Sequence, residues 1–379
     1  MLSFVCGSTA VSINNWYAGR DFHCFWVAGR IVASGGDPYD AGQYVPAIAT
    51  IPPNESTALL RCGQRLSYPP WTAFALAPFG ALSLPNAAAL WASLTLMAAV
   101  IGIRWTWQLA GRGRLSWPLV ALLVVATEPF ARAFAEGQFG TFVFALTAGA
   151  ALSLLSNRDR AGGIYTATLS VKPHIAVGFA AVALGLAILR RRWRFVGASG
   201  AVALGIVGLT QLLRPGWLLE FFGGAIELSG SLRERATIWN LAGSWPPAVV
   251  VIALLFAVVL VLIRTRSVAD ADILGLAVVF SLVITPYAWS HDYVVLAIPW
   301  SMIVGHARAL RPLPRYALTM STVIVAVPVL WVLSDVAAAR GTASLSVLVP
   351  MTTAVLLALA IRLGSGRGPS ATDLISSAS

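Results

Sequence analysis

Long apolar runs are the feature that most limits how this 379-residue chain can fold. Many of them reach about 16–22 residues, the length at which a helix crosses the hydrocarbon core of a bilayer. Because lipid offers no partner for backbone polar groups, a spanning segment is either a helix or a strand of a closed barrel. Barrel strands alternate apolar and polar residues, and these runs do not. The sequence therefore predicts an all-α polytopic membrane protein.

The apolar runs are spread over most of the chain. They cover residues 86–108, 116–131, 139–156, 161–171, 174–189, 195–213, 246–263, 267–285, 291–305, 316–334 and 344–362. Residues 1–13 form a shorter run, which we expect to be the end of a helix that starts upstream, and they lack the basic start and cleavage site of a signal peptide. Residues 71–84 are short and contain proline, which favours a juxtamembrane or re-entrant helix. About 12 membrane helices are thus predicted, within a single domain over residues 1–379.

Charge divides the loops between these runs into two alternating sets. One set consists of short loops with 16 of the 26 basic residues, all of them arginine, and such loops face the cytoplasm. The other set holds 11 of the 15 carboxylates and two long regions, 15–85 and 214–245. We therefore expect the function at the outer face and a disordered cytoplasmic tail at 363–379. The net charge of +11 then reflects topology rather than nucleic-acid binding.

Asp21 is the first candidate for chemistry. It stands in a loop with Gly and Pro, directly before residues 22–34, which are predicted to form an amphipathic helix. Two interpretations stay open. Aspartate is a favoured helix N-cap, and a partly buried carboxylate at the mouth of a membrane cavity suits a general base. Asp21 can fill both roles only if one carboxylate oxygen caps the helix and the other stays available as the base.

Lys172 is the only lysine in the chain, and it separates two short apolar runs at 161–171 and 174–189. The shortness of both runs indicates that the segment from Lys172 to His174 is sunk below the membrane surface, where broken backbone must line protein or a wet cavity. A charge at this depth is costly and usually functional. An ammonium is suited to phosphate as a compact point charge; the alternative is a lysine that only anchors a helix end.

Other polar residues lie at the outer ends of predicted helices. His291 is suited to donate to phosphate or sugar with Asp292 orienting it, or it is a histidine satisfied at an interface. Gln138 either binds sugar hydroxyls or caps a helix. Arg132 offers a further positive charge for a phosphate.

The second outer region and the cysteines add two possibilities. Trp239 and Asn240 are suited to stack on and hydrogen-bond a sugar, although tryptophan in such loops is often an interfacial anchor. Three cysteines are too few for a disulfide framework, but Cys24 and Cys62 can pair if the first outer region is extracytoplasmic. The chain has no P-loop, no G-x-S-x-G, no H-E-x-x-H and no Cys/His metal spacing. We therefore expect no metal and no cofactor.

Seven short motifs follow one another along the chain. They are Asp21-Phe22, Phe25-Trp26-x-Ala28-Gly29-Arg30, Gly36-Asp37-Pro38-Tyr39-Asp40, Tyr68-Pro69-Pro70, Gly137-Gln138, Lys172-Pro173 and His291-Asp292-Tyr293. In this order they resemble glycosyltransferase family 87, whose members are polytopic enzymes of the GT-C class. Each motif alone is weakly specific, and the resemblance covers nearly the whole chain. Gln138 is followed by Phe139 and Gly140 where the family often has Asn nearby, which leaves the sugar and the acceptor open.

The resemblance implies a GT-C fold with juxtamembrane helices on the outer face. It implies transfer of a sugar, typically mannose or arabinofuranose, from a polyprenyl-phosphate donor to a lipoglycan or glycolipid outside the plasma membrane of actinobacteria. The family aspartate that matches Asp21 is the catalytic base. We expect an inverting transfer of mannose, with the donor, the acceptor and membrane lipids as the partners. The expected substrate- and phosphate-binding residues are Lys172, His291, Arg132, Gln138, Tyr68, His174, Asp292, Trp239 and Asn240.

A lipid-linked sugar flippase or transporter is the alternative from another class. The number of predicted helices permits it. Transporters, however, generally show internal repeats and polar groups at the membrane midplane, whereas the polar groups here gather at one face.

Overall fold

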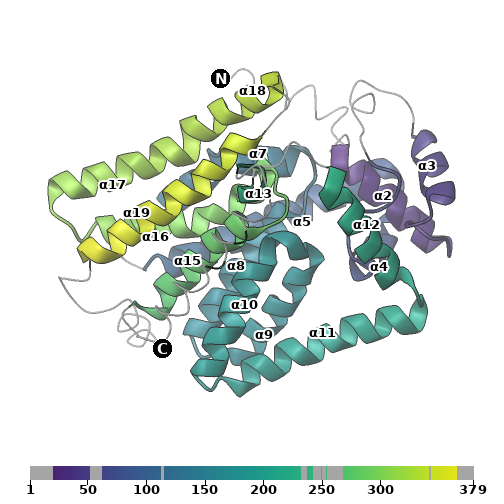
Figure 1. The fold of residues 1–379 in the computed structure, drawn as a ribbon, viewed down its shortest axis with the longest axis horizontal. Coiled ribbons are helices and arrows are strands. Elements are labelled where there is room, and N and C mark those ends of the chain that lie inside the picture. The colour runs from purple at the N-terminus through teal and green to yellow at the C-terminus, as the bar shows by residue number, and fades with distance from the viewer. Residues whose placement is uncertain are drawn as a thin grey trace. The chain divides into compact units, whose positions relative to one another are not determined.

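The computed structural model describes residues 20–51, 62–111, 115–231, 237–241, 249, 253, 268–340 and 343–364. Within these ranges the chain folds into helices and contains no β-strand, which confirms the all-helical prediction for this part of the chain (Figure 1). The chain is divided into two compact units. Unit 1 comprises Met1–Met97, Arg132–Phe139 and Leu204–Ser231, and unit 2 comprises Ala98–Ala131, Gly140–Ala203 and Leu232–Ser379. The single domain expected over residues 1–379 stays a prediction.

Four helical stretches among the described residues are long and apolar enough to cross a membrane. They are α5 (Leu84–Leu109), α11 (Trp193–Leu213), Pro312–Ala337 and Ser344–Gly364. A fifth is possible if α6 (Trp117–Val125) and α7 (Glu128–Ala135), which are bent by 66°, form one broken span. The predicted runs 1–13 and most of 246–263 lie outside the described residues, as does the tail beyond residue 364. The count of 12 therefore stays a prediction.

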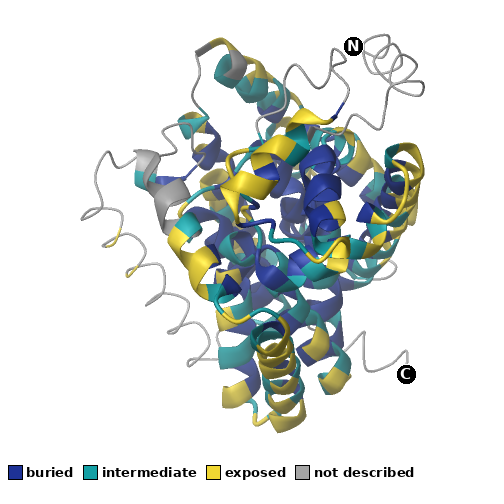
Figure 2. Ribbon diagram, turned by 90° about the vertical axis from the view of Figure 1, so that its right-hand side faces the viewer, coloured by how far each residue is buried: buried dark blue, intermediate teal, exposed yellow. Residues whose placement is uncertain are grey.

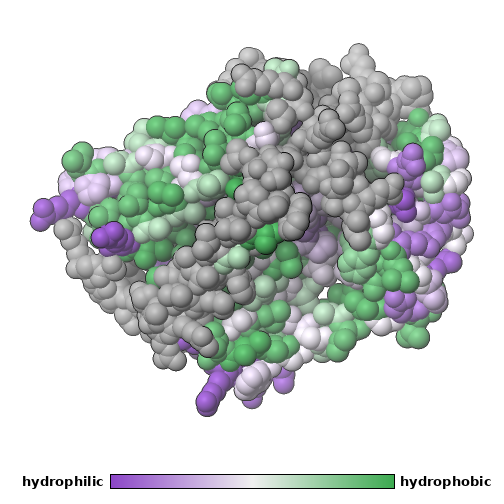
Figure 3. All heavy atoms as spheres, viewed as in Figure 1, coloured by the Kyte–Doolittle hydropathy of each residue, from purple (hydrophilic) through white to green (hydrophobic). Residues whose placement is uncertain are grey.

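Apolar side chains on the long helices face outward. In α11, Leu204 is 75% exposed and Leu212 is 83% exposed. Figure 3 shows such hydrophobic side chains over large parts of the visible surface, and Figure 2 shows helices that are buried on one side and exposed on the other. In water a surface of this kind would be an aggregation liability. In lipid it is the expected outer face of a spanning helix.

Unit 1 is built around α2 (Arg20–Ala33) and α4 (Pro70–Gly80), which pack against each other. Glycine lets their backbones meet, because a Cβ on Gly29 would lie 2.2 Å from the Leu76 carbonyl oxygen and one on Gly80 would lie 2.0 Å from the Arg30 nitrogen. α3 (Ala41–Ala49) packs on α2, and α12 (Trp217–Ser231) packs on α4. The predicted helix 22–34 and the predicted short helix at 71–84 are both present.

Unit 2 consists of helices packed around a largely apolar core. Besides α6, its described elements are α8 (Gly140–Leu155), α9 (Asp159–Thr168), η2 (Leu169–Val171), α10 (Pro173–Leu189), α13 (Ile238–Leu241), α15 (Asp270–Ile284), η3 (Ser290–Leu296), α16 (Ala297–Ala307), α17 (Pro312–Ile324), η4 (Val325–Val329), α18 (Leu330–Arg340), η5 (Ser344–Val347) and α19 (Leu348–Gly364). α10 and α15 approach closely at Gly178 and Ser281. Helical structure is interrupted at Lys172, between η2 and α10, at the position where the sequence predicts an interruption.

Candidate functional site

Asp21 is the second residue of α2, two positions after the N-cap position, so the interpretation as an N-cap is wrong. The backbone N–H groups of Asp21 and Phe22 both donate to the carbonyl oxygen of Glu136, at 3.2 Å each. The first N–H groups of a helix have no partner within it, so this carbonyl from another segment satisfies them. The start of α2 is thereby fixed to the end of α7.

The end of α7 is a helix C-terminus closed by glycine. Gly137 has a φ of 68°, a left-handed conformation that favours glycine. The N–H of Gln138 donates to Ala133 at 2.8 Å and that of Gly137 to Phe134 at 3.2 Å, the bond pair of a Schellman motif. The Gly137 carbonyl accepts the Trp91 indole N–H at 2.8 Å. This turn places the Gln138 side chain beside the start of α2.

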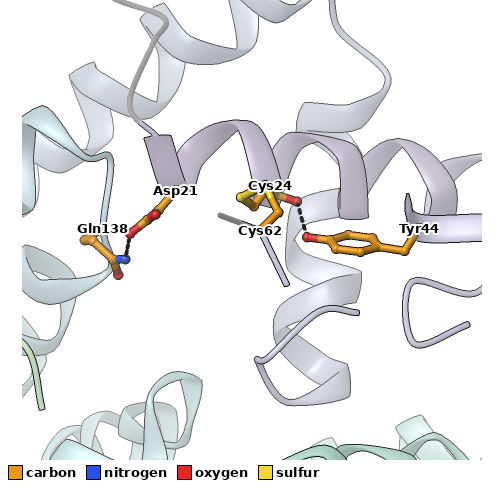
Figure 4. The surroundings of a disulfide bond; sticks show 5 residues. All are labelled: Asp21, Cys24, Tyr44, Cys62 and Gln138. Atoms are coloured by element: carbon orange, nitrogen blue, oxygen red, sulfur yellow. Dashed lines mark hydrogen bonds between the residues drawn. A yellow bond between two sulfur atoms is a disulfide. The ribbon is translucent and has the colours of Figure 1, made fainter. Parts of the chain in front are cut away.

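Three side chains form a hydrogen-bonded chain at this junction. The Gln138 amide Nε2 donates to Asp21 Oδ2 (Figure 4). The Tyr68 hydroxyl donates to the Oε1 of the same amide at 2.9 Å. We call Asp21, Gln138 and Tyr68 the Asp21 cluster. Gln138 is 6% exposed, whereas Asp21 and Tyr68 are half-buried, so the cluster joins the interior of unit 1 to its surface.

Aromatic rings pack behind the Asp21 cluster. The Tyr68 ring lies 4.9 Å from Phe25 and 5.2 Å from Phe139, measured between centroids. Phe139 in turn packs edge-on against Trp91 at 4.9 Å. Such pairs add about 0.5–1.5 kcal/mol each beyond the area they bury. The Tyr68 ring therefore has little freedom to move away from Gln138.

The segment that carries Tyr68 is also attached to α2 and to the turn before α3. A disulfide joins Cys24 on α2 to Cys62 (Figure 4), which confirms the pairing that the sequence left open. Tyr39 donates its hydroxyl to the Tyr68 carbonyl at 2.6 Å. Burial, with Asp37 nearby, raises the pKa of Tyr39 far above its ordinary value, so the phenol stays a neutral donor.

Asp37 and Asp40 hold the predicted Gly-Asp-Pro-Tyr-Asp turn. Asp37 accepts the Tyr39 N–H at 2.8 Å and the Trp217 indole N–H at 2.9 Å. Asp40 caps α3 by accepting the Gly42 N–H at 2.8 Å. Both carboxylates therefore accept backbone N–H groups of this segment, and Asp37 also binds the Trp217 side chain of α12. Across the described residues, no three His, Cys, Asp or Glu side chains gather in a way that could hold a metal ion.

A second polar cluster lies in unit 2, at the break before α10. The Lys172 Nζ is 2.5 Å from Asp292 Oδ1, and the two side chains are 3% and 0% exposed. Asp292 also accepts the Trp289 N–H at 3.0 Å, and its Oδ1 lies 3.6 Å from His291 Nε2. We call Lys172, His291 and Asp292 the Lys172 cluster. The sequence singled out all three residues, but it did not predict that Lys172 and Asp292 form a buried ion pair.

The remaining candidates in unit 2 mostly make structural contacts. The His174 ring stacks on Tyr287 with 4.0 Å between centroids. The Trp239 indole donates to the Ile284 carbonyl at 3.0 Å, and the side chain of Asn240 lies outside the described part of the chain. Glu128 accepts the Ser290 hydroxyl at 2.9 Å while 2% exposed. Sequence reasoning did not select Glu128; its signal was a carboxylate inside an apolar run.

Arg132, in the last turn of α7, pairs with Glu136, which directly follows the helix. The distance from its Nε to Glu136 Oε1 is 3.3 Å, and the arginine side chain is 40% exposed. An exposed pair of this kind contributes little to stability. The guanidinium therefore remains at the surface, close in sequence to the turn that presents Gln138.

The two clusters have different chemical capacities. A carboxylate held by a neutral amide can take a proton from a hydroxyl. An ammonium beside an imidazole can bind an anion.

Comparison with known proteins identifies the family. The family model that matches is "Glycosyltransferase family 87", over residues 66–286. The matched region includes Tyr68, Gln138 and Lys172, while Asp21 and His291 lie on either side of it. No curated protein matched the chain. Because the match spans more than half of the 379 residues, the chain belongs to glycosyltransferase family 87.

Proposed function

We propose that this family 87 glycosyltransferase is an integral membrane enzyme that moves mannose from polyprenyl phosphate to a hydroxyl of a lipoglycan or glycolipid. The observation that carries the proposal is the Asp21 carboxylate, held at the start of α2 by the Gln138 amide. Within a glycosyltransferase family, a carboxylate fixed at a half-buried position is the natural candidate for the base.

The proposed reaction is a single inverting displacement. Asp21 removes the proton of the acceptor hydroxyl as that oxygen forms a bond to the anomeric carbon. The bond from this carbon to the phosphate oxygen breaks on the opposite face, and its electron pair stays with polyprenyl phosphate. A positioned general base contributes roughly 10²–10⁴ in rate.

Stabilisation of the phosphate is the role we propose for Lys172 and His291, with Arg132 as a further contributor. Negative charge grows on the leaving oxygen during the transfer, and preorganised positive groups stabilise it. Asp292 is 2.5 Å from the ammonium and 3.6 Å from the imidazole. We therefore assign Asp292 the role of holding both groups in place.

An extracytoplasmic site at the plasma membrane is supported by two independent features. Disulfides persist in oxidising compartments and are rare in the cytosol, and Cys24 is paired with Cys62. The short arginine-rich loops, which should face the cytoplasm, alternate along the chain with the loops of the set that contains Asp21. Both features favour the outer side for the segment around Asp21.

The test is a transfer assay with purified protein in lipid vesicles. Polyprenyl-phosphate mannose with a labelled sugar is supplied with a glycolipid acceptor, and a new labelled glycosidic product is the expected result. If only polyprenyl-phosphate arabinofuranose gives a product, the donor sugar is arabinofuranose and not mannose. Movement of labelled donor across the vesicle without any bond formed would contradict the proposal and favour a transporter.

A further inference from the structure

The Gln138 side-chain amide has a donor group, NH₂, and an acceptor, its carbonyl oxygen, and it is the donor group that faces Asp21. The NH₂ group points to Asp21 Oδ2, and the carbonyl oxygen accepts the Tyr68 hydroxyl at 2.9 Å. Reversed, the amide would set its oxygen against a carboxylate and leave its NH₂ facing a phenol. An ionised carboxylate only accepts hydrogen bonds, so the NH₂ end of Gln138 must face Asp21, and the Tyr68 hydroxyl then holds the amide by donating to its carbonyl end.

The backbone fixes where both partners stand. The Glu136 carbonyl accepts the N–H groups of Asp21 and Phe22, and the left-handed Gly137 turns the chain so that Gln138 follows directly. The Tyr68 ring packs against Phe25, and the Tyr68 carbonyl oxygen accepts the hydroxyl of Tyr39. Each member of the Asp21 cluster is therefore positioned by contacts outside the cluster.

We infer that Gln138 and Tyr68 are positioning residues: the phenol fixes the amide, and the amide keeps the Asp21 carboxylate ionised and oriented toward an acceptor hydroxyl. The inference rests on the proposed function, in which Asp21 is the base. The two hydrogen bonds lie within the cluster itself. That Gln138 and Tyr68 also bind substrate directly stays a prediction.

The neighbouring segments bring several ionisable side chains near Asp21. Among the described residues they are His23 on α2, Tyr44 on α3, Tyr68, Arg132 in the last turn of α7 and Glu136 directly after it. Burial, with the charge of Asp21 nearby, raises the pKa of Tyr44 well above its ordinary value, so that phenol is neutral and adds no charge beside Asp21. A hydrogen bond to the ionised form of an acid lowers its pKa. Removal of the Gln138 amide should therefore raise the pKa of Asp21.

The test follows the Asp21 carboxyl group directly by infrared titration. Its carboxylic-acid band is identified as the one missing from Asp21→Asn protein. Gln138→Met, which keeps the volume and loses the donor, should move the protonation midpoint up by about one pH unit. Tyr68→Phe should move it in the same direction by less, because the amide stays but is free to turn. The acidic limb of the kcat/KM profile should shift with the midpoint.

Tyr44→Phe is the matched control. It also removes one phenol in unit 1, whose hydroxyl donates to the Cys24 carbonyl at 3.2 Å (Figure 4), and it should leave the Asp21 midpoint unchanged. An unchanged midpoint in folded Gln138→Met or Tyr68→Phe protein would overturn the inference, as would an equal shift in Tyr44→Phe. The infrared readout needs no turnover, so this result stands apart from failure of the proposed function, which would appear as no transfer by the wild type.

Discussion

The two clusters each contain an aspartate, but the partners of the two carboxylates differ. Asp21 accepts from the neutral Gln138 amide, whereas Asp292 is bonded to the Lys172 ammonium and is fully buried. An amide stabilises a carboxylate without cancelling its charge. An ammonium cancels it. Asp21 is therefore suited to take up a proton, and Asp292 is suited to hold a cation.

The supports of the two clusters differ as well. The Asp21 cluster is held by a helix junction, a disulfide and ring packing, so its geometry depends little on charge. The Lys172 cluster is held together by its own ion pair in a buried setting. Loss of one partner should therefore have very different consequences in the two places.

The largest expected effect is on the Lys172 cluster. Lys172→Met leaves Asp292 buried without its cation, and breaking a buried pair in this way costs about 3–5 kcal/mol. Asp21→Asn should change stability by less than about 1 kcal/mol, because Asn can still bond to Gln138. Thermal unfolding in detergent measures both, and the double variant Lys172→Met/Asp292→Asn should recover part of the loss. Equal melting of the two single variants would remove the distinction between the clusters.

The disulfide gives the next effect. Cys24→Ser/Cys62→Ser should lower stability by about 2–4 kcal/mol, because the unfolded chain loses a constraint. A reductant should lower the melting temperature of the wild type and leave that of the double variant where it is. If reduction does not affect the wild type, the disulfide is not a support of the Asp21 cluster.

Backbone contact between α2 and α4 gives a somewhat smaller effect. Gly80→Ala places a Cβ 2.0 Å from the Arg30 nitrogen and should cost about 1–3 kcal/mol through overpacking. Gly200→Ala in α11 is the control, since no atom lies within 4 Å of its added Cβ, and it should be neutral or slightly stabilising. Similar melting of both variants would show that α2 and α4 do not meet at these glycines.

The smallest effect is expected at the turn that supports Tyr39. Trp217→Phe removes the indole N–H that donates to Asp37 and keeps the stack on Phe74, whose centroid is 5.3 Å away. The expected cost is about 1 kcal/mol. Trp117→Phe, at a 41% exposed position, provides the comparison and should cost less. A larger loss of stability in Trp117→Phe than in Trp217→Phe would show that the bond from Trp217 to Asp37 does not support this turn.

Much of the fold could be predicted from local patterns. Apolar runs gave the positions of most described helices, proline and glycine marked the turns, and two short runs revealed the break at Lys172. The pairing of Gln138 with Asp21 could not be predicted in this way. It joins residues 117 positions apart and depends on a carbonyl, Glu136, whose role has no sequence signal.

The ion pair shows the same limit from another direction. Lys172 and Asp292 were each recognisable as polar residues in apolar surroundings, and such residues need partners. Which residues pair is set by how η2, α10 and η3 each pack on α8, and periodicity does not specify this packing. Asp37 was likewise predicted to lie in a turn, but its partner Trp217 is 180 residues away.

The central claim is that Asp21 is the base, and turnover of Asp21→Asn measures it most directly. Asp40→Asn is the matched control, because Asn caps a helix as well as Asp does and Asp40 caps α3. With both proteins folded in vesicles, Asp21→Asn should lose about 10²–10⁴ of the rate of mannose transfer, and Asp40→Asn should keep it. Near wild-type transfer by Asp21→Asn would contradict the account.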